Sequence, residues 1–417
     1  MTDTRLKELA EYGFDDVEIS QLRNALFEIA KQTLEHYDEI CEEDLRSLGQ
    51  LTELRHELRK HSPLAETNVM KLYSYIDELL DSIKDHGTPQ FTRQARCAFM
   101  ARSFCRTLVE KGYFTKQEMD DFMLSIPTVA SEFERDFDLY SHGKLSRDDF
   151  NHLYGHLRLG TYDIRSDSYR NIYFDVASAN LTGNNKVKQE AKSLDLERLQ
   201  VALDEAGIPV TPEKFIEFIK KATQNREYFK FEFTKSLSLM LDVIVKLGEV
   251  MAIAREDMSY LEIQDLLSYH SRDSYIQTIE TRRRFYHVNS YLVLPEVIFD
   301  VGDIDVIDID EARPNFITNK VVEAPIVNLD EDHDSDITGK IVVLTKADPG
   351  YDWIFAKDIA GFVTKYGGAA SHMAIRCAEF GIPAAIGCGE KIYQRIHRMQ
   401  IMCLDCENGR ITEKQSQ

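Results

Sequence analysis

The run GGAASHMAIRCAEFGIPAAIG, residues 367–387, decides the fold of the C-terminal part of the chain. It opens on two glycines, which can turn sharply because they lack a β-carbon. Ser371 is a residue type that caps helices, and the apolar residues after it recur at helical spacing. Gly381 accepts the left-handed conformation that ends a helix, and Pro383 cannot continue one. The run therefore predicts a turn, a short helix and then a strand at 384–386.

The segments around this run complete a small α/β unit. Apolar, β-branched runs predict strands at 340–345 and 361–364, and the short helix spans about 371–380. Residues 314–318 begin with a proline and the run 330–336 is rich in aspartate, so we interpret both as connecting segments.

The chain before residue 286 is predicted to be mainly helical. Apolar residues repeat there at steps of three and four, which places them on one face of a helix. Three such stripes stand out: Leu22, Leu26, Ile29 and Thr33; Val69, Leu72, Ile76, Leu79 and Ile83; and Phe229, Phe233, Leu237, Met240, Ile244, Leu247 and Met251. We interpret all three as faces buried in a helical bundle.

The pattern changes between residues 292 and 309, where apolar residues alternate with acidic ones at strand periodicity. A boundary near residue 313 follows. The predicted fold class is α+β and multidomain: a large, mainly helical N-terminal region at 1–285, a linker with short strands at 286–313, and a small α/β domain at 314–417.

Composition limits the classes of function. The 417 residues suffice for two or three domains, and a net charge of -21 disfavours non-specific binding to nucleic acid or anionic membranes. Asp3 and Glu8 interrupt the start and no long uncharged apolar stretch occurs, so we expect a cytoplasmic protein. Seven cysteines suit a reducing compartment. We interpret the lone pair Cys403 and Cys406 as a structural strand end rather than a zinc or redox site.

The chemistry of the C-terminal domain centres on His372, in the first turn of its predicted helix. Free backbone N–H groups and the helix dipole favour negative charge there. Imidazole is substantially neutral near pH 7, so it can act as a nucleophile and carry a phosphoryl group. Arg376 lies four residues on, on the same helix face, and Thr364 ends the preceding strand, where its hydroxyl could orient the ring. On spacing alone, a structural histidine in a helical first turn explains the same pattern.

The run 367–387 resembles the mobile phosphohistidine domain of the phosphoenolpyruvate-utilising enzymes, which include phosphoenolpyruvate synthase, pyruvate phosphate dikinase and rifampicin phosphotransferase. The histidine, glycines and proline are in register over more than twenty positions. Ala370 and Cys377 depart mildly from the family pattern, and Ser371 takes the slot beside the histidine.

In that family the histidine domain swivels between a site where it takes a phosphoryl group from a nucleotide and a site where it passes the group on. The resemblance implies that His372 is the phosphoryl carrier. The catalytic residues would be His372, Ser371, Thr364 and Arg376, with Gly367 and Gly368 as the phosphate loop.

A second stretch, YGHLRLGTYDI at 154–164, has two glycines among polar residues, which suits a loop that presents side chains. It resembles a central segment of rifampicin phosphotransferase and L-glutamine kinases, in which Leu159 tends to be proline. Residues 254–257, at the end of the long helix, resemble another family element. The acceptor-binding residues implied are His156, Arg158, Tyr162, Asp163, Arg255 and Glu256. A helix break with surface charges, and a surface ion pair for Arg255 and Glu256, remain the structural alternatives.

No motif for binding a nucleotide or a metal is evident. Gly155 and Gly160 have phosphate-loop spacing, but Thr161 and Tyr162 follow them instead of lysine and serine or threonine. The residues 138–149 lack the ligands of an EF-hand. Nothing resembles the family's ATP-grasp domain or its barrel.

The leading hypothesis from sequence is therefore a split kinase. A separate ATP-grasp protein would supply ATP and Mg²⁺, and this chain would relay the phosphoryl group to a small metabolite. The alternative hypothesis is a non-enzymatic phosphohistidine carrier that signals to a partner protein. The third hypothesis is a degenerate domain that has kept only a structural role. The sequence leaves the acceptor, the donor and the oligomeric state open.

Overall fold

The computed structural model describes residues 6, 8–158, 162–171, 193–289, 301, 314–331, 335–346, 349–369 and 371–414. Contacts divide the chain into two compact units, each built from three segments. Unit 1 comprises Met1–His61, Glu78–Glu132 and Asn185–Ser236, and unit 2 comprises Ser62–Asp77, Phe133–Asn184 and Leu237–Gln417.

Unit 1 is built from helices. They are η1 (Leu9–Tyr12), α2 (Asp16–Glu35), α3 (Tyr37–Lys60), the second half of α4 (Val69–His86), α5 (Thr88–Glu110), α6 (Lys116–Leu124), α9 (Leu196–Ala206) and the first part of α10 (Pro212–Val250). Capping boxes start α2 at Asp15 and α6 at Thr115. The core of this unit packs side chains of α5, α6, α9 and α10 together, with Phe122, Leu199 and Ile219 fully buried.

Two of the three apolar stripes are buried as predicted. Leu72, Ile76 and Leu79 of α4 are almost wholly buried, and so are Phe229 and Leu247 of α10. The prediction for the first stripe is wrong: Leu22, Leu26 and Ile29 of α2 are exposed. Periodicity identifies the apolar face of a helix but does not show whether the same chain covers it.

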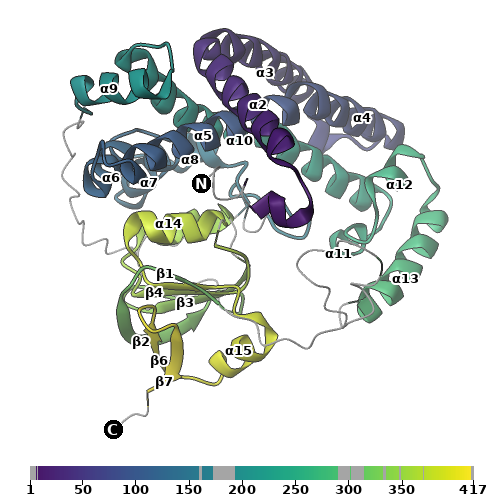
Figure 1. Cartoon of the computed structure of the whole chain (residues 1–417). Coiled ribbons are helices and arrows are strands. Elements are labelled where there is room, and N and C mark those ends of the chain that lie inside the picture. The colour runs from purple at the N-terminus through teal and green to yellow at the C-terminus, as the bar shows by residue number, and fades with distance from the viewer. Residues whose placement is uncertain are drawn as a thin grey trace. The chain divides into compact units, whose positions relative to one another are not determined.

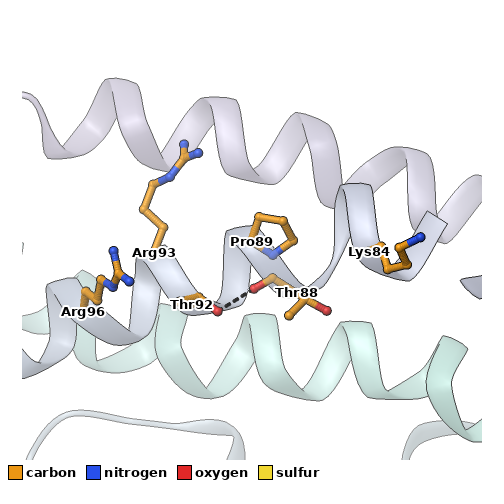
Figure 2. A pocket seen from close by; sticks show the side chains of 6 residues that line it. All are labelled: Lys84, Thr88, Pro89, Thr92, Arg93 and Arg96. Atoms are coloured by element: carbon orange, nitrogen blue, oxygen red, sulfur yellow. Dashed lines mark hydrogen bonds between the residues drawn. The ribbon is translucent and has the colours of Figure 1, made fainter. Parts of the chain in front are cut away.

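A pocket of about 430 Å³ opens in unit 1 at the junction of α4 and α5 (Figure 2). It is lined by Lys84, Thr88, Pro89, Thr92, Arg93 and Arg96. Two of its cations already have carboxylate partners, since Lys84 pairs with Asp81 at 3.3 Å and Arg93 pairs with Asp44 at 3.0 Å. The pocket is therefore close to neutral locally, despite its three basic side chains.

Unit 2 combines helices with a sheet. Its further helices are η2 (Pro63–Ala65), most of α7 (Val129–Ser141), α8 (Arg147–Tyr154), the rest of α10, α11 (Arg255–Met258), α12 (Ile263–Leu267) and α13 (Arg272–Asn289). Its C-terminal part holds β1 (Asn315–Ile317), β2 (Val321–Asn328), β3 (Ile341–Lys346), η5 (Pro349–Ala356), β4 (Gly361–Tyr366), α14 (His372–Phe380), β5 (Ala384–Ile386), α15 (Gly389–Ile396), β6 (Ile401–Asp405) and β7 (Arg410–Glu413).

The seven strands form one mixed sheet in the order β1-β5-β4-β3-β2-β6-β7. Strands β2, β3, β4 and β5 run parallel, and β1, β6 and β7 join antiparallel. Ile341 and Val343 face a core that includes Tyr393 and Ile396 of α15. Val342 and Leu344 point to the opposite face, because side chains alternate along a strand. Figure 1 shows α14 beside this sheet.

The predicted fold class, a mainly helical region followed by a small α/β domain, is confirmed. The strands predicted at 340–345, 361–364 and 384–386 are present as β3, β4 and β5, and the helix predicted at about 371–380 is α14. The interpretation of 314–318 as a connecting segment is wrong, because Asn315–Ile317 forms β1 and pairs with β5.

The linker predicted at 286–313 lies mostly outside the described residues. Helix α13 continues to Asn289, and only Val301 is described between there and residue 314. The strand pattern at 292–309 and the boundary near 313 therefore stay predictions. In the part of the chain that the structure describes, no helix is long and apolar enough to cross a membrane.

Candidate active site

His372 is the first residue of α14. Ser371 caps this helix, since its hydroxyl accepts a hydrogen bond from the Ala374 N–H at 3.4 Å. Gly381 ends the helix in the left-handed conformation at φ 64°. Met373, Ala374 and Cys377 are buried, so they fix α14 against its own domain. The local sequence thus positions the His372 ring at the start of a rigid helix.

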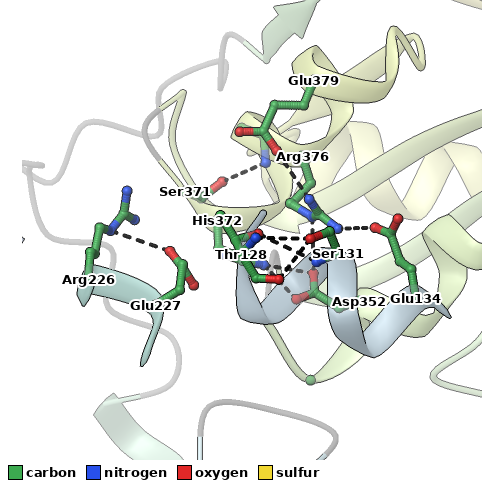
Figure 3. Close-up of polar contacts among 12 residues, drawn as sticks. Thr128, Ser131, Glu134, Arg226, Glu227, Asp352, Ser371, His372, Arg376 and Glu379 are labelled. Atoms are coloured by element: carbon green, nitrogen blue, oxygen red, sulfur yellow. Dashed lines mark hydrogen bonds and ion pairs between the residues drawn. The ribbon is translucent and has the colours of Figure 1, made fainter. Parts of the chain in front are cut away.

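Asp352, from η5, holds the His372 ring (Figure 3). The His372 Nε2 lies 2.7 Å from one carboxylate oxygen of Asp352 and 2.9 Å from the other. A proton on Nε2 satisfies this contact, because a carboxylate only accepts hydrogen bonds. The lone pair of the neutral ring is then on Nδ1, and the tautomer is set by the carboxylate.

Sequence reasoning missed Asp352. The signal was present in residues 348–353, Asp-Pro-Gly-Tyr-Asp-Trp, which follow the predicted strand now seen as β3. Strand β3 runs parallel to β4, whose end leads to His372, and the carboxyl ends of parallel strands share one edge of a sheet. An acidic residue after β3 was thus a candidate partner for the histidine.

Arg376 lies beside this pair, as its spacing predicted. Its Nε is 3.8 Å from Asp352, its guanidinium pairs with Glu134 and with Glu379, and it lies over the Phe380 ring at 4.6 Å. Burial opposes the charge of this guanidinium, but the three carboxylates outweigh burial and raise the pKa of Arg376. The arginine is therefore a fixed cation next to Asp352, and a phosphate oxygen near it would compete with carboxylates.

Thr364 has a different place from the one expected. It is fully buried, its hydroxyl accepts a hydrogen bond from the Gly387 N–H at 3.2 Å, and its carbonyl accepts one from the Cys388 N–H at 2.9 Å. Among the described residues it makes no hydrogen bond with His372. Thr364 therefore ties β4 to the turn after β5.

The two glycines of the predicted phosphate loop, Gly367 and Gly368, differ in whether a side chain could replace them. Gly367 has a φ of +131°, and a β-carbon on Gly387 would clash with the Gly367 carbonyl oxygen. A β-carbon on Gly368 would meet nothing within 4 Å. The positive φ of Gly367 therefore explains the first glycine of the pair, the close approach explains Gly387, and the position of a β-carbon on Gly368 is open space.

Arg158 and Arg255 meet at one loop of unit 2. The fully buried Arg158 donates to the Ser166 carbonyl at 2.6 Å and to the Ser238 hydroxyl at 3.1 Å, and it pairs with Asp242. Arg255 donates to the Ile164 carbonyl at 2.7 Å and to the same Ser166 carbonyl at 3.3 Å, and it pairs with Asp167. The hydrogen bonds and ion pairs of both guanidinium groups go to protein atoms.

The other predicted acceptor-binding residues lie around this loop. His156 is buried, and Tyr162 has a φ of +49°, an uncommon backbone conformation for a residue other than glycine. Asp163 accepts hydrogen bonds from the Arg165 side chain, which lower the pKa of Asp163. Glu256 is exposed in the first turn of α11. Helix α11 follows a break after α10, so residues 254–257 do not end the long helix as expected.

The structure brings both clusters into unit 2. The hydroxyl of the buried Tyr169 donates to the Gly350 carbonyl at 2.6 Å, two residues before Asp352. Residues 159–161 of the predicted acceptor segment, and Ala370 beside Ser371, lie outside the described residues.

No group of three or more His, Cys, Asp or Glu side chains in the described residues could hold a metal ion. Cys403 lies in β6 and Cys406 follows it, and the Cys406 thiol donates to the Ala384 carbonyl at 3.5 Å. Burial raises the pKa of the Cys406 thiol to about 11.

The comparisons with known proteins bear on the domain that holds His372. Residues 337–409 match the family described as PEP-utilising enzyme, mobile domain. This part of the chain is thus similar to the mobile domain that the run 367–387 indicated.

Two curated relatives are similar to this chain. The rifampicin phosphotransferase of Bacillus subtilis (strain 168) is 28% identical over 222 residues, which are 48% of this chain and 24% of the relative. The rifampicin phosphotransferase of Bacillus cereus (strain ATCC 14579) is 26% identical over 212 residues, which are 46% of this chain and 24% of the relative. The matched part thus spans about a quarter of each relative.

Proposed function

We propose that this chain is a phosphotransferase component that relays a phosphoryl group through His372. The observation that carries the proposal is the Nε2 of His372 held at 2.7 Å by Asp352, at the start of a capped helix in a PEP-utiliser mobile domain. Similarity to two phosphotransferases supports the reaction class.

The chemistry balances around the histidine. The unprotonated ring nitrogen attacks the terminal phosphorus of a nucleotide, the N–P bond forms, and the bond to the leaving phosphate oxygen breaks. The proton on the other ring nitrogen stays with the His372–Asp352 pair, which stabilises the charge that develops on the ring. In the second step an acceptor hydroxyl oxygen attacks the phosphorus and gives its proton to solvent, the N–P bond breaks and His372 regains its lone pair.

The position of Asp352 distinguishes two routes. With the carboxylate in place on Nε2, the reacting nitrogen is Nδ1. If the phosphoryl group is attached to Nε2, Asp352 has to leave that nitrogen first. The ³¹P–¹⁵N coupling pattern of the phosphorylated chain distinguishes these two positions.

We propose that the loop at 162–168 belongs to the acceptor site. The predicted residues His156, Arg158, Tyr162, Asp163, Arg255 and Glu256 would serve it in two ways. Arg158 and Arg255 would position the loop through the Ser166 carbonyl, and the side chains of Tyr162, Asp163 and Glu256 are the better candidates for direct contact. A preorganised loop is what an in-line transfer requires.

The nucleotide is proposed to come from a separate ATP-grasp protein that binds ATP and Mg²⁺. This proposal rests on the resemblance of the run 367–387 to enzymes in which the histidine domain takes its phosphoryl group from a nucleotide. The acceptor is proposed to be a small metabolite.

Transfer of the label from the histidine tests this function. The chain is phosphorylated with γ-labelled ATP and an ATP-grasp protein, freed of nucleotide and mixed with pools of amino acids, amides and sugars. Loss of label to one metabolite, abolished in Asp163→Asn but kept in Asp405→Asn, is the result expected of a kinase component. Label that moves only to a partner protein would replace this proposal with the carrier alternative.

A further inference from the structure

Helix α2 has an apolar face that is exposed among the described residues. Leu22, Leu26 and Ile29 are 41%, 43% and 53% exposed. From Asp16 to Ile29 every residue of α2 is exposed except Ile19, which is partly exposed. The helix meets the core of unit 1 only near its end, where Leu34 is fully buried.

Exposed apolar side chains concentrate in this region. Seven of the 23 large exposed apolar side chains in the described part of the chain lie within residues 12–29. Scattered exposed leucines are ordinary, but three of these side chains, Leu22, Leu26 and Ile29, share one face of α2, and an exposed apolar face of this kind marks an interaction surface.

The spacing on α2 is that of a coiled-coil seam. Ile19, Leu22, Leu26, Ile29 and Thr33 follow one another at steps of three, four, three and four, which is the repeat of the a and d positions of a heptad. Such a seam is complementary to a copy of itself, because each layer pairs the same side chain from both helices in a parallel pair. We propose that α2 pairs in parallel with α2 of a second copy of this chain. This surface is separate from the His372 site, and the inference does not depend on the proposed function.

Charges beside the seam favour the parallel arrangement. Glu18 and Arg23 lie at the g and e positions that flank it. In a parallel pair the g position of one helix lies opposite the e position five residues on in the other, so Glu18 of each copy, whose carboxylate also accepts the Asp15 N–H at 3.0 Å in the capping box, lies opposite Arg23 of its partner. The two pairs form on opposite sides of one two-fold axis.

The seam is short, which sets the strength of the pairing. Its four layers from Ile19 to Ile29 are accessible, and Thr33 is half-buried where the helix joins its unit. An interface limited to this helix falls in the small, transient class, below about 1,200 Å² in total. We therefore expect a dimer that forms at about 10–100 μM and dissociates on dilution.

Sedimentation velocity of the full chain over a dilution series tests the pairing. The wild-type chain is expected to shift from monomer to dimer as its concentration rises, and Leu26→Glu is expected to stay monomeric. Val17→Glu is the matched control: Val17 is also exposed, at 63%, but lies on the opposite side of the helix from the seam. Circular dichroism checks that both variants keep the helix content of the wild-type chain.

Cysteine cross-linking tests the direction. Ile19→Cys and Ile29→Cys are each expected to form a disulfide-linked dimer under mild oxidation, because a parallel pair brings identical layers together. The native thiols give little background, since six are buried and Cys403 is partly so. A chain that stays monomeric at about 100 μM, or a dimer that Leu26→Glu leaves unchanged, would overturn the proposal. A disulfide that forms only when the Ile19→Cys and Ile29→Cys variants are mixed would show that the two helices run antiparallel. That result would overturn the parallel arrangement.

Discussion

At the scale of single residues, Asp352 lies between two side chains of α14 and contacts both. His372 and Arg376 lie where helical spacing placed them, and they share Asp352 between them. Arg158 is fully buried and its bonds go to the protein. A motif shows which residue types occur together, but burial and partners depend on segments distant in the sequence, here Asp242 of α10 for Arg158 and η5 for His372.

The role of Asp352 is open to a direct prediction. Asp352→Asn keeps the size of the side chain but removes the negative charge that fixes the ring tautomer. We expect labelling of His372 to slow by at least about tenfold, since a positioned proton-holding group contributes roughly 10²–10⁴-fold in rate. Glu413→Gln, on the exposed β7, is the control that should label at the wild-type rate. An unchanged rate in Asp352→Asn would remove Asp352 from the mechanism.

Arg158 makes a prediction about stability. Arg158→Met removes a buried cation, takes away the Arg158 partner of Asp242 and leaves the Ser166 carbonyl with the longer hydrogen bond from Arg255, so unfolding in urea should become easier by roughly 3–5 kcal/mol. Arg165→Met removes a half-exposed ion pair with Asp163 and should change the free energy of unfolding by less than about 1 kcal/mol. If Arg158→Met is as stable as the wild-type chain but fails to transfer label to the acceptor, Arg158 contacts the acceptor directly.

At the scale of elements, neighbouring residues in the sequence were enough to predict helices and strands whose ends depend on those same residues. The cap at Ser371 and the left-handed Gly381 define α14, and β-branched runs define β3 and β4. Strand β1 is only three residues long and exists through its pairing with β5, about seventy positions away, so its own sequence does not predict it. The exposed apolar stripe of α2 is the corresponding case for a helix, because its sequence does not show which segment covers it.

The close approach of Gly387, in the turn after β5, to Gly367 can be tested by substitution. Gly387→Ala introduces a β-carbon against the Gly367 carbonyl oxygen at a φ of +76°, so the thermal midpoint should fall by an amount equivalent to at least about 1–2 kcal/mol. Gly368→Ala meets open space and should change stability by less than about 0.5 kcal/mol. Differential scanning calorimetry compares the two, and equal midpoints would refute the packing role of Gly387.

At the scale of the whole molecule, the sequence predicted the fold class and the family of the C-terminal domain. It did so because the run 367–387 combines a cap, a turn and a reactive side chain within twenty-one positions. The helical region carries no such compact signature, and its loop at 162–168 is tied to α10 by the buried Arg158 and to α11 by the partly buried Arg255. Only the folded chain shows that these residues meet.

The central claim is that His372 carries the phosphoryl group, and a single labelling measurement tests it most directly. The chain is incubated with γ-labelled ATP, Mg²⁺ and an ATP-grasp protein, and labelled peptides are identified by mass spectrometry under alkaline conditions. We predict acid-labile, alkali-stable label on the peptide that contains His372, and none in a His372→Asn variant that unfolds at the wild-type temperature. Label that persists in His372→Asn, or no label on the wild-type chain with either ATP or phosphoenolpyruvate as donor, would contradict the claim.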